Sequence, residues 1–435
     1  MEEVSKKITA KIEVSSDTFK EIEKKVKSIS TFKEKIEKSL TKRITEILEI
    51  ILGGAILLEA SDIHIEPIEK EARLRARIDG ILQDVMSFNL EIYQRVLNRI
   101  KLLSGIKLNI TDRPQDGRFS VLFGESLIEI RVSTLPAEHG ESIVLRILNP
   151  KSLIGMAALG LREDLLQIFS KEIKKPNGMI IVTGPTGSGK TTTLYAFLKK
   201  IQKPEIKIIT IEDPIEYHLK GISQTQVNPA RGYDFANGLK AIMRQDPDVI
   251  LVGEIRDLET AQIALQAALT GHLVLTTLHT NDAAGTIARL VSLGAKLADI
   301  APAINIAVAQ RLIRKICKEC SEIKTISQKD FGKLKKELRG ISKNIKLPKL
   351  TKSLKIPQAV GCKNCNFTGF KGRIGVFEAF FVDDEMEKFI LTKPAIAALK
   401  EKAIKRGMLT IKQDGLVKVL EGITTIEEVE RVTGE

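Results

Sequence analysis

The chain has 435 residues, of which 43% are hydrophobic and 4% aromatic, with no tryptophan and a formal net charge of +13. This length exceeds one ordinary core, so we expect several domains with aliphatic interiors, and the scarcity of aromatic rings argues against nucleic-acid recognition by base stacking. No apolar run is long enough to cross a bilayer and the N-terminus has no hydrophobic signal core, which predicts a cytoplasmic protein.

The first part of the chain differs in composition from the rest. It is rich in lysine, glutamate, isoleucine and leucine, and Ile36, Leu40, Ile44 and Leu48 have the spacing of one helical face. We interpret residues 1–48 as a charged helical arm. A helix that docks on a partner is the alternative.

Residues 49–150 predict a small α+β domain. Ala60–Pro67 and Glu71–Leu82 alternate between apolar and polar residues around an Asp-Gly turn, which is typical of strands. A helix is expected at Leu90–Ser104, and further segments with strand-like alternation continue to the end of this domain.

Two arginines lie in the last strands of this domain. Arg131 is part of the segment IEIRVS and Arg146 of IVLRIL, and the alternation places both on the strand face opposite the core. Exposed strand charge is the ordinary interpretation of such residues. The functional alternative is a pair of guanidinium groups presented to a triphosphate from a neighbouring domain or subunit, because their planar forks match phosphate oxygens.

After a linker at residues 151–158, residues 159–316 predict an α/β nucleotide-binding domain. The segment GPTGSGKTT fits the phosphate-loop pattern and lies between an apolar strand at Gly178–Thr183 and a helix at residues 190–201, as the pattern requires. Its glycines let backbone N–H groups face phosphate oxygens, its lysine reaches the β and γ phosphates, and the threonine after the lysine holds Mg²⁺. We predict binding of ATP and Mg²⁺ by Gly184, Pro185, Thr186, Gly187, Ser188, Gly189, Lys190, Thr191 and Thr192.

Further apolar strands are expected at residues 206–211, 249–252 and 273–278, with a helix at residues 258–269. Continuous apolar strands of this kind predict a parallel sheet that is buried on both faces. Residues that handle phosphate are expected at the carboxyl ends of such strands. Polar residues do follow these strands in the sequence, and they are Glu212, Asp213, Glu216, Glu254 and His279.

These side chains suit the chemistry of a bound triphosphate. Glu254 and Glu212 are candidate ligands of Mg²⁺, which prefers carboxylate oxygens. Glu216 is our choice for the carboxylate that positions the attacking water. His279, with His272 as a weaker candidate, could sense the γ phosphate by a hydrogen bond, although a lone histidine is more often a structural residue.

The cysteines form two pairs with C-x-x-C spacing, Cys317 with Cys320 and Cys362 with Cys365. In a reducing compartment such pairs favour a metal over disulfides, and together they supply four thiolates to one structural Zn²⁺. We predict a tetracysteine metal-binding subdomain at residues 317–375, followed by a C-terminal helical lobe at residues 376–435.

The segment between the two cysteine pairs is strongly basic. Residues 321–361 carry eleven Lys and Arg against three Asp and Glu, so this segment contributes +8 to the net charge. A solvated insertion and an anion-binding surface for lipid headgroups or nucleic acid remain equal alternatives.

These motifs stand in one order with several others along the chain. Together they resemble the secretion and pilus-assembly ATPases of the GspE/PilB group, from Ala60 to the C-terminus, and the other segments are ASDIHIEP, RPQDGR, RVSTLP, EDPIE, RQDPDVILVGEIRD, TGHLVLTTLHTND, AQRLIRKIC and GMLTIKQDGL. The resemblance implies a homo-hexameric ring in which a PAS-like N-terminal domain precedes a RecA-like motor domain. Retraction motors of the PilT type lack the paired cysteines, so the resemblance is to the assembly side.

The resemblance also implies roles for particular residues. Glu216 would be the catalytic carboxylate of the acidic box, Glu254 the Walker B residue, and His279 a member of the histidine box. Arg131 and Arg146 fall where this group supplies arginines to the γ phosphate across the domain junction.

We therefore expect a Mg-ATP hydrolysing hexameric motor at the cytoplasmic face of the inner membrane. It would power the assembly of pilin-like subunits or protein secretion through a platform protein in that membrane, with peripheral membrane contact. The group usually has a longer N-terminal region that docks on a membrane-anchoring partner, so the docking of residues 1–48 is open.

Two other functions are alternatives. A RecA-like motor that translocates nucleic acid is favoured by the positive charge and opposed by the few aromatic residues. A nucleotide-gated scaffold without hydrolysis is opposed by the presence of Glu216 and Glu254.

Overall fold

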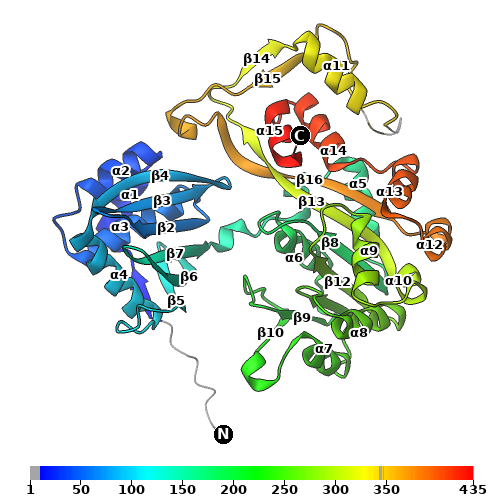
Figure 1. Cartoon of the computed structure of the whole chain (residues 1–435), viewed down its shortest axis with the longest axis horizontal. Helices are drawn as coiled ribbons and strands as arrows, with labels where there is room; N and C mark the ends of the chain where they lie inside the picture. Colours follow the sequence, from blue (N-terminus) through cyan, green and yellow to red (C-terminus); the bar gives the residue numbers. More distant parts are fainter. Residues whose placement is uncertain (1–9, 342–344, 346, 435) are drawn as a thin grey trace. The chain divides into compact units, whose positions relative to one another are not determined.

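The computed structural model describes residues 10–341, 345 and 347–434, and the chain divides into two compact bodies (Figure 1). The first comprises the chain up to Ser152 together with Cys317–Cys320 and Val360–Lys371. The second comprises Leu153–Ile316, Ser321–Ala359 and Gly372–Glu435.

The first body is built on a seven-stranded sheet with the order β1-β5-β6-β7-β2-β3-β4. All its neighbouring strands are antiparallel except β1 and β5, which are parallel. The strands are β1 (Lys11–Glu13), β2 (Asp62–Pro67), β3 (Glu71–Ile78), β4 (Ile81–Asn89), β5 (Gln115–Phe123), β6 (Ser126–Ala137) and β7 (Gly140–Leu148). The helices are α1 (Ser16–Lys25), α2 (Ile29–Glu37), α3 (Ile44–Leu57) and α4 (Leu90–Ser104).

The helices before β2 are part of the core of this body. Ile22, Phe32, Ile36 and Leu48 are all buried in the same hydrophobic cluster as the inward residues of the strands. The predicted arm at residues 1–48 is therefore corrected. Its described part, from residue 10, packs into the α+β domain, and its predicted end falls inside α3. The lysines and glutamates that suggested an arm cover the outer faces of amphipathic helices.

The second body contains another seven-stranded sheet, with the order β10-β9-β11-β12-β8-β13-β16. The strands from β10 to β13 in this order are parallel to their neighbours, which confirms the predicted parallel sheet. The strands are β8 (Gly178–Thr183), β9 (Ile208–Glu212), β10 (Ser223–Gln226), β11 (Val249–Val252), β12 (Leu273–Leu278), β13 (Ile304–Ile316) and β16 (Phe370–Phe381).

Helices pack against this sheet, and every residue of β8, β9, β11 and β12 is buried. The helices along this part of the chain are α5 (Glu163–Glu172), α6 (Lys190–Ile201), α7 (Phe235–Met243), α8 (Leu258–Leu269), α9 (Gly285–Ser292) and α10 (Leu297–Ala303). The last helices are α12 (Asp384–Leu391), α13 (Ile396–Lys405), α14 (Ile411–Leu420) and α15 (Ile426–Thr433).

Strand β16 changes the predicted domain limits. It spans the expected boundary between residues 375 and 376 and adds a strand to the main sheet beside β13. The nucleotide-binding domain therefore continues beyond residue 316. The predicted C-terminal lobe becomes helical only from α12 onward.

The basic segment between the cysteine pairs folds as a small unit of two strands and a helix in its described part. It contains β14 (Glu322–Thr325), α11 (Gln328–Glu337) and β15 (Lys355–Gln358), with β14 and β15 antiparallel. Leu334 and Ile356 share a hydrophobic cluster with Leu416 and Val429 of the C-terminal helices. The described part of this segment is therefore anchored by apolar packing on α14 and α15.

Within the part of the chain that the structure describes, no helix combines the length and apolarity needed to traverse a bilayer.

Candidate active site

The parallel register brings four loops to the same edge of the main sheet. Val252 at the end of β11 lies opposite Ile211 of β9 and Thr276 of β12, and Thr183 at the end of β8 lies opposite Leu278. Because parallel strands end at a common edge, the residues that follow these strands are neighbours in space.

The phosphate loop follows β8 and leads into α6. Gly184, Gly187 and Gly189 have φ values of 144°, 78° and 86°, where a side chain is strained. A Cβ on Gly184 would lie 2.4 Å from the carbonyl oxygen of Gln310 on β13. The glycine spacing in the sequence therefore matches both a backbone requirement and a steric one.

Two side chains of the loop are positioned to receive an anion. Lys190 Nζ donates to the carbonyl oxygens of Gly184 and Pro185, at 2.8 and 3.2 Å. Burial lowers the pKa of Lys190, and the carboxylate of Glu254 opposes that shift. Ser188 is 4% exposed, and its hydroxyl oxygen is buried with no hydrogen-bond partner among the described residues. A buried polar atom of this kind fits a loop that completes its hydrogen bonds with a ligand.

A group of charged side chains lies beside the loop. The Glu254 carboxylate is 3.5 Å from His279 Nε2 and is hydrogen-bonded by the Arg256 guanidinium. Arg256 also lies 3.8 Å from Asp213, the residue after β9. Burial lowers the pKa of His279, as does the nearby Lys190 ammonium, while Glu254 opposes these effects. The structure therefore brings together the residues that follow β8, β11 and β12.

Glu212 was predicted as a ligand of Mg²⁺, and the structure corrects this. It is 3% exposed, and its carboxylate accepts hydrogen bonds from Tyr195, Thr210 and Gln224. Burial raises its pKa. The carboxylate belongs to the interior, because alternate strand residues point to opposite faces and the next residue, Asp213, is the one that is exposed.

The two histidines at β12 lie at opposite ends of the strand. His279 follows the strand at the edge that carries the phosphate loop and is 53% exposed. His272 precedes the strand, and its carbonyl accepts from Gly178 at the start of β8. His272 is therefore excluded as a partner of the phosphate loop. Glu216 is half-buried in the loop after β9, and its assigned role stays a prediction.

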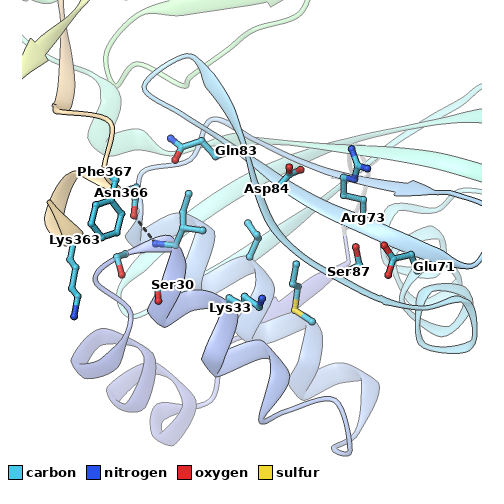
Figure 2. A pocket seen from close by; sticks show the side chains of 14 residues that line it. Ser30, Lys33, Glu71, Arg73, Gln83, Asp84, Ser87, Lys363, Asn366 and Phe367 are labelled. Carbon is cyan, nitrogen blue, oxygen red and sulfur yellow. Dashed lines mark hydrogen bonds between the residues drawn. The ribbon is translucent and has the colours of Figure 1, made fainter. Parts of the chain in front are cut away.

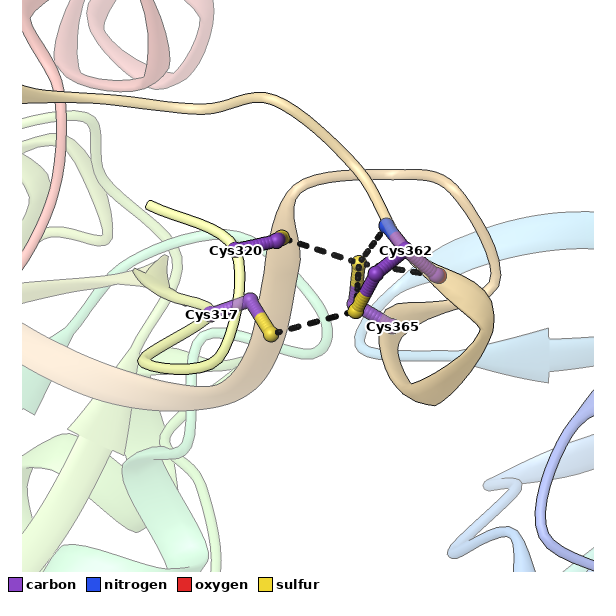
Figure 3. Close-up of side chains that lie close together, drawn as sticks. All are labelled: Cys317, Cys320, Cys362 and Cys365. Carbon is purple, nitrogen blue, oxygen red and sulfur yellow. Dashed lines mark hydrogen bonds between the residues drawn. The ribbon is translucent and has the colours of Figure 1, made fainter. Parts of the chain in front are cut away.

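The cysteines converge as their spacing predicted (Figure 3). All four Sγ atoms lie within 4.8 Å of one another, with Cys317–Cys362, Cys320–Cys365 and Cys362–Cys365 separations of 3.9, 3.7 and 3.8 Å. Ligands 2.3 Å from a tetrahedral Zn²⁺ lie about 3.8 Å apart, so this donor set fits the ion. Although burial opposes it, the N–H groups of Cys362 and Gly369 lower the pKa of Cys365 to about 7.

The cysteine loop of residues 362–367 also contacts the start of α2 within the first body. Asn366 Oδ1 accepts a hydrogen bond of 2.7 Å from the N–H of Ile29, one of the amides that a helix leaves unpaired (Figure 2). Asn366 and Phe367 have φ values of 51° and 58°. A groove of about 840 Å³ lies here, lined by Lys363, Asn366, Phe367, Lys33, Arg73 and Asp84 among others.

A model of the type II/IV secretion system protein family matches residues 37–431. The chain belongs to this family. It is 44% identical over 398 residues to the type II secretion system ATPase E of Vibrio cholerae, across 90% of this chain and 76% of that protein. It is 41% identical over 389 residues to the type IV pilus assembly ATPase PilB of Pseudomonas aeruginosa, across 89% of this chain and 66% of that one.

Solved structures agree with this assignment. The pilus retraction motor PilT with bound ADP has a TM-score of 0.58 at 26% identity, and the alignment covers 88% of this chain and 95% of that one. The Legionella pneumophila ATPase DotB has a TM-score of 0.63 at 23% identity, over 88% and 94% of the two chains, which shows the shared fold. The chain is thus an ATPase of the type II/IV secretion family with a RecA-like core.

Two residues at the site of this secretion-family ATPase were missed from the sequence. Gln310 is 2% exposed, accepts a hydrogen bond from Thr193 of α6, and presents its backbone to Gly184. Arg256 connects Glu254 with Asp213. A polar residue inside the apolar strand INIAVAQRLI was the available signal for Gln310, and no local pattern separates Arg256 from ordinary surface arginines.

In the first body, the predicted arginines are neighbours in a row across the sheet. Arg118, Arg131 and Arg146 lie opposite one another on β5, β6 and β7, and Asp62 of β2 lies opposite Arg146. Arg146 is 54% exposed, and its Nε lies 3.0 Å from Asp62. The row occupies the face opposite the hydrophobic cluster, as the alternation predicted.

Proposed function

We propose that the chain hydrolyses Mg-ATP as a homo-hexamer and that this hydrolysis powers the assembly of pilin-like subunits or protein secretion through an inner-membrane platform protein. The observation that carries the proposal is the meeting of the phosphate loop, Glu254 and His279 at one edge of the parallel sheet. The similar proteins named above, a type II secretion ATPase and a pilus assembly ATPase, support a role in secretion or assembly.

The residues divide the chemistry among them. The loop from Gly184 to Thr192 would hold the phosphates, with Lys190 moving from its two backbone carbonyls to phosphate oxygens. Thr191 and Glu254 would hold Mg²⁺, which supplies charge neutralisation at the β and γ phosphates.

The remaining roles belong to the groups around the γ phosphate. Glu216 would orient the attacking water and accept its proton. His279, whose pKa is lowered by burial, would hydrogen-bond the γ phosphate. Arg131 and Arg146 would stabilise the charge of the transferring phosphoryl group from another domain or subunit.

We further propose that Cys317, Cys320, Cys362 and Cys365 hold a structural Zn²⁺. The short separations of their sulfur atoms and the N–H groups aimed at Cys365 support this assignment. Each cysteine loop would supply two of the four ligands, so the ion would hold the two loops together. Because protein ligands would fill all four coordination positions, the site would be structural.

The expected working place is the cytoplasmic face of the inner membrane, with a membrane-anchoring partner as the second contact. The partner proteins would determine which machine the chain powers: a secretion system, a pilus or a DNA-uptake pseudopilus. The nucleic-acid motor is the competing function, because the net charge of +13 attracts polyanions.

The deciding experiment measures ATP turnover of the purified chain with and without Mg²⁺. The additions are duplex DNA, single-stranded DNA, and anionic vesicles with the cytoplasmic part of a platform protein. We expect stimulation by vesicles and platform protein and none by DNA. Stimulation by DNA alone would transfer the function to nucleic-acid translocation. Glu216→Gln is the control, which should bind ATP and lose roughly 100-fold or more of turnover.

A further inference from the structure

The loop that carries His279 is tied to the phosphate loop. The N–H of Thr280 donates to Thr183 Oγ1 at 2.8 Å, and Thr183 is the residue before Gly184. The Thr280 hydroxyl donates to the carbonyl of Asp282 at 2.9 Å. Thr280 therefore connects Asp282 to the residue that precedes the phosphate loop.

Asp282 is held in turn by a helix of the C-terminal lobe. Its Oδ1 accepts from the N–H of Gly285, the first residue of α9, at 2.9 Å. Its Oδ2 lies 3.1 Å from the ammonium of Lys400 on α13. This ion pair is partly shielded from solvent, since the two side chains are 34% and 27% exposed.

A second carboxylate meets the same loop from β16. Glu378 is 2% exposed, and its Oε1 accepts a hydrogen bond of 3.0 Å from the N–H of Ala283. Burial raises the pKa of Glu378, Lys400 acts to lower it, and Asp282 acts to raise it. Lys400 therefore pairs with one of the two carboxylates that hold the loop and favours the charged form of the other.

We propose that Lys400 is a positioning residue for hydrolysis: it fixes the loop of residues 279–285 through Asp282 and Glu378, so that the placement of α13 regulates the ATPase site. This inference rests on the proposed hydrolysis at that site. Through this lysine, the C-terminal helices would sense or control the nucleotide at the loop that carries His279.

The physical reason is the balance of charge around the loop. Asp282 acts to raise the pKa of Glu378, and the Lys400 ammonium, 3.1 Å from Asp282, acts to lower it. Without this ammonium, Asp282 loses its electrostatic restraint, and the hydrogen bonds that the N–H groups of Ala283 and Gly285 donate to Glu378 and Asp282 open more often. The rate of hydrolysis depends steeply on where the catalytic groups lie relative to the substrate, because misplacing one of them by about 1 Å can cost roughly 100-fold in rate.

Helix α13 also offers a matched control. Lys402 is two residues further on, is 32% exposed, and pairs with Glu385 of α12. Its replacement removes the same charge from the same helix without touching the loop. Lys400→Met and Lys402→Met therefore replace two lysines of similar exposure, and Lys400→Arg tests whether keeping the positive charge keeps the rate.

The experiment measures kcat and the affinity for a fluorescent ATP analogue in the full chain. We expect Lys400→Met to lower kcat by roughly tenfold or more with affinity changed by less than about threefold. Lys402→Met should match wild type, and Lys400→Arg should recover most of the lost rate. Equal kcat values for Lys400→Met and Lys402→Met overturn the inference.

Hydrogen exchange separates this inference from the proposed function. The amides of Ala283 and Gly285 should exchange faster in Lys400→Met than in wild type and be unchanged in Lys402→Met. A wild type without ATP turnover would refute the proposed function, and the exchange result would still decide whether Lys400 restrains the loop. Unchanged exchange in Lys400→Met refutes that restraint, even if the variant has lower stability in urea.

Discussion

Lys190 holds two backbone carbonyls of its own loop, at 2.8 and 3.2 Å, and these contacts are exchangeable for phosphate oxygens. Its pKa is lowered by burial, so a bound anion would stabilise its charged form. We expect Lys190→Ala to weaken ATP binding by roughly 10- to 100-fold, the worth of one hydrogen bond between charged groups. Titration with a fluorescent ATP analogue measures this, and unchanged affinity would contradict the assignment of the loop.

Glu212 gives a prediction about pH. Its pKa is raised from 4.5 by burial, so the folded protein holds this proton more tightly than the unfolded chain does. The stability that the neutral carboxyl contributes is present below pH 4.5 and is lost as the pH rises through the raised pKa. Glu212→Gln should therefore gain free energy of unfolding relative to wild type as the pH rises from about 4 to 8. Urea unfolding of both proteins at several pH values tests this, and parallel curves would argue against a perturbed Glu212.

At the scale of elements, the cysteine loop and α2 form one unit of structure. Asn366 is bonded to Ile29 at the beginning of α2, while Asn364 of the same loop is bonded to Glu319 and Lys371. We predict about one Zn²⁺ per chain and faster hydrogen exchange at the start of α2 after chelation, because the loop conformation depends on its metal ligands.

The control variants separate the metal from the hydrogen bond. Asn366→Ala should keep the metal and lose protection at Ile29, whereas Asn364→Ala should keep both. Metal analysis and exchange mass spectrometry report the two quantities. A protein that is free of metal and keeps full protection at α2 would be inconsistent with this coupling.

A buried ion cluster joins α14 to the segment before α5. Asp414 is fully buried, and its carboxylate binds Arg162 at 2.5 Å, Lys418 at 3.0 Å and the N–H of Phe377 at 2.8 Å. Burial acts to raise the pKa of Asp414, but Lys418 and Arg162 lower it overall. Removing this carboxylate leaves Arg162 and Lys418 buried without the negative charge that pairs with them.

We expect Asp414→Ala to cost about 3–5 kcal/mol of unfolding free energy, the range for breaking a buried ion pair. Asp164→Ala is the comparison, because Asp164 also pairs with Arg162 but is 36% exposed, and it should cost less than about 1 kcal/mol. Chemical denaturation measures both. Equal losses for the two variants would mean that burial is not what makes Asp414 important.

At the scale of the whole molecule, the arginine row lies in the first body and the phosphate loop in the second. If one subunit's arginines act on its neighbour's nucleotide, inactive variants can complement each other. We predict that Arg146→Ala and Glu216→Gln subunits are each inactive alone. Their mixtures should recover measurable turnover, because some interfaces then pair an intact arginine with an intact glutamate. Mixtures as inactive as their components would refute action between subunits.

The sequence by itself determined the local structure of the nucleotide-binding domain. The strands at residues 178–183, 249–252 and 273–278 and the helices at 190–201 and 258–269 have the predicted limits, and the strand expected at residues 206–211 is found at 208–212. These features are encoded in short-range apolar periodicity and in glycines whose backbone angles only glycine tolerates, so neighbouring residues suffice to read them. The C-x-x-C spacing is of the same kind, since each pair is read from neighbouring residues alone.

Only the tertiary structure decided which residues far apart in sequence share a site. It turned Glu212 into the core, excluded His272, added β16 to the sheet, and built the described part of residues 1–48 into a domain. The contacts of Gln310 with Thr193 and of Lys400 with Asp282 join residues more than one hundred positions apart. Such contacts depend on how whole elements pack, and periodicity along the chain carries no information about them.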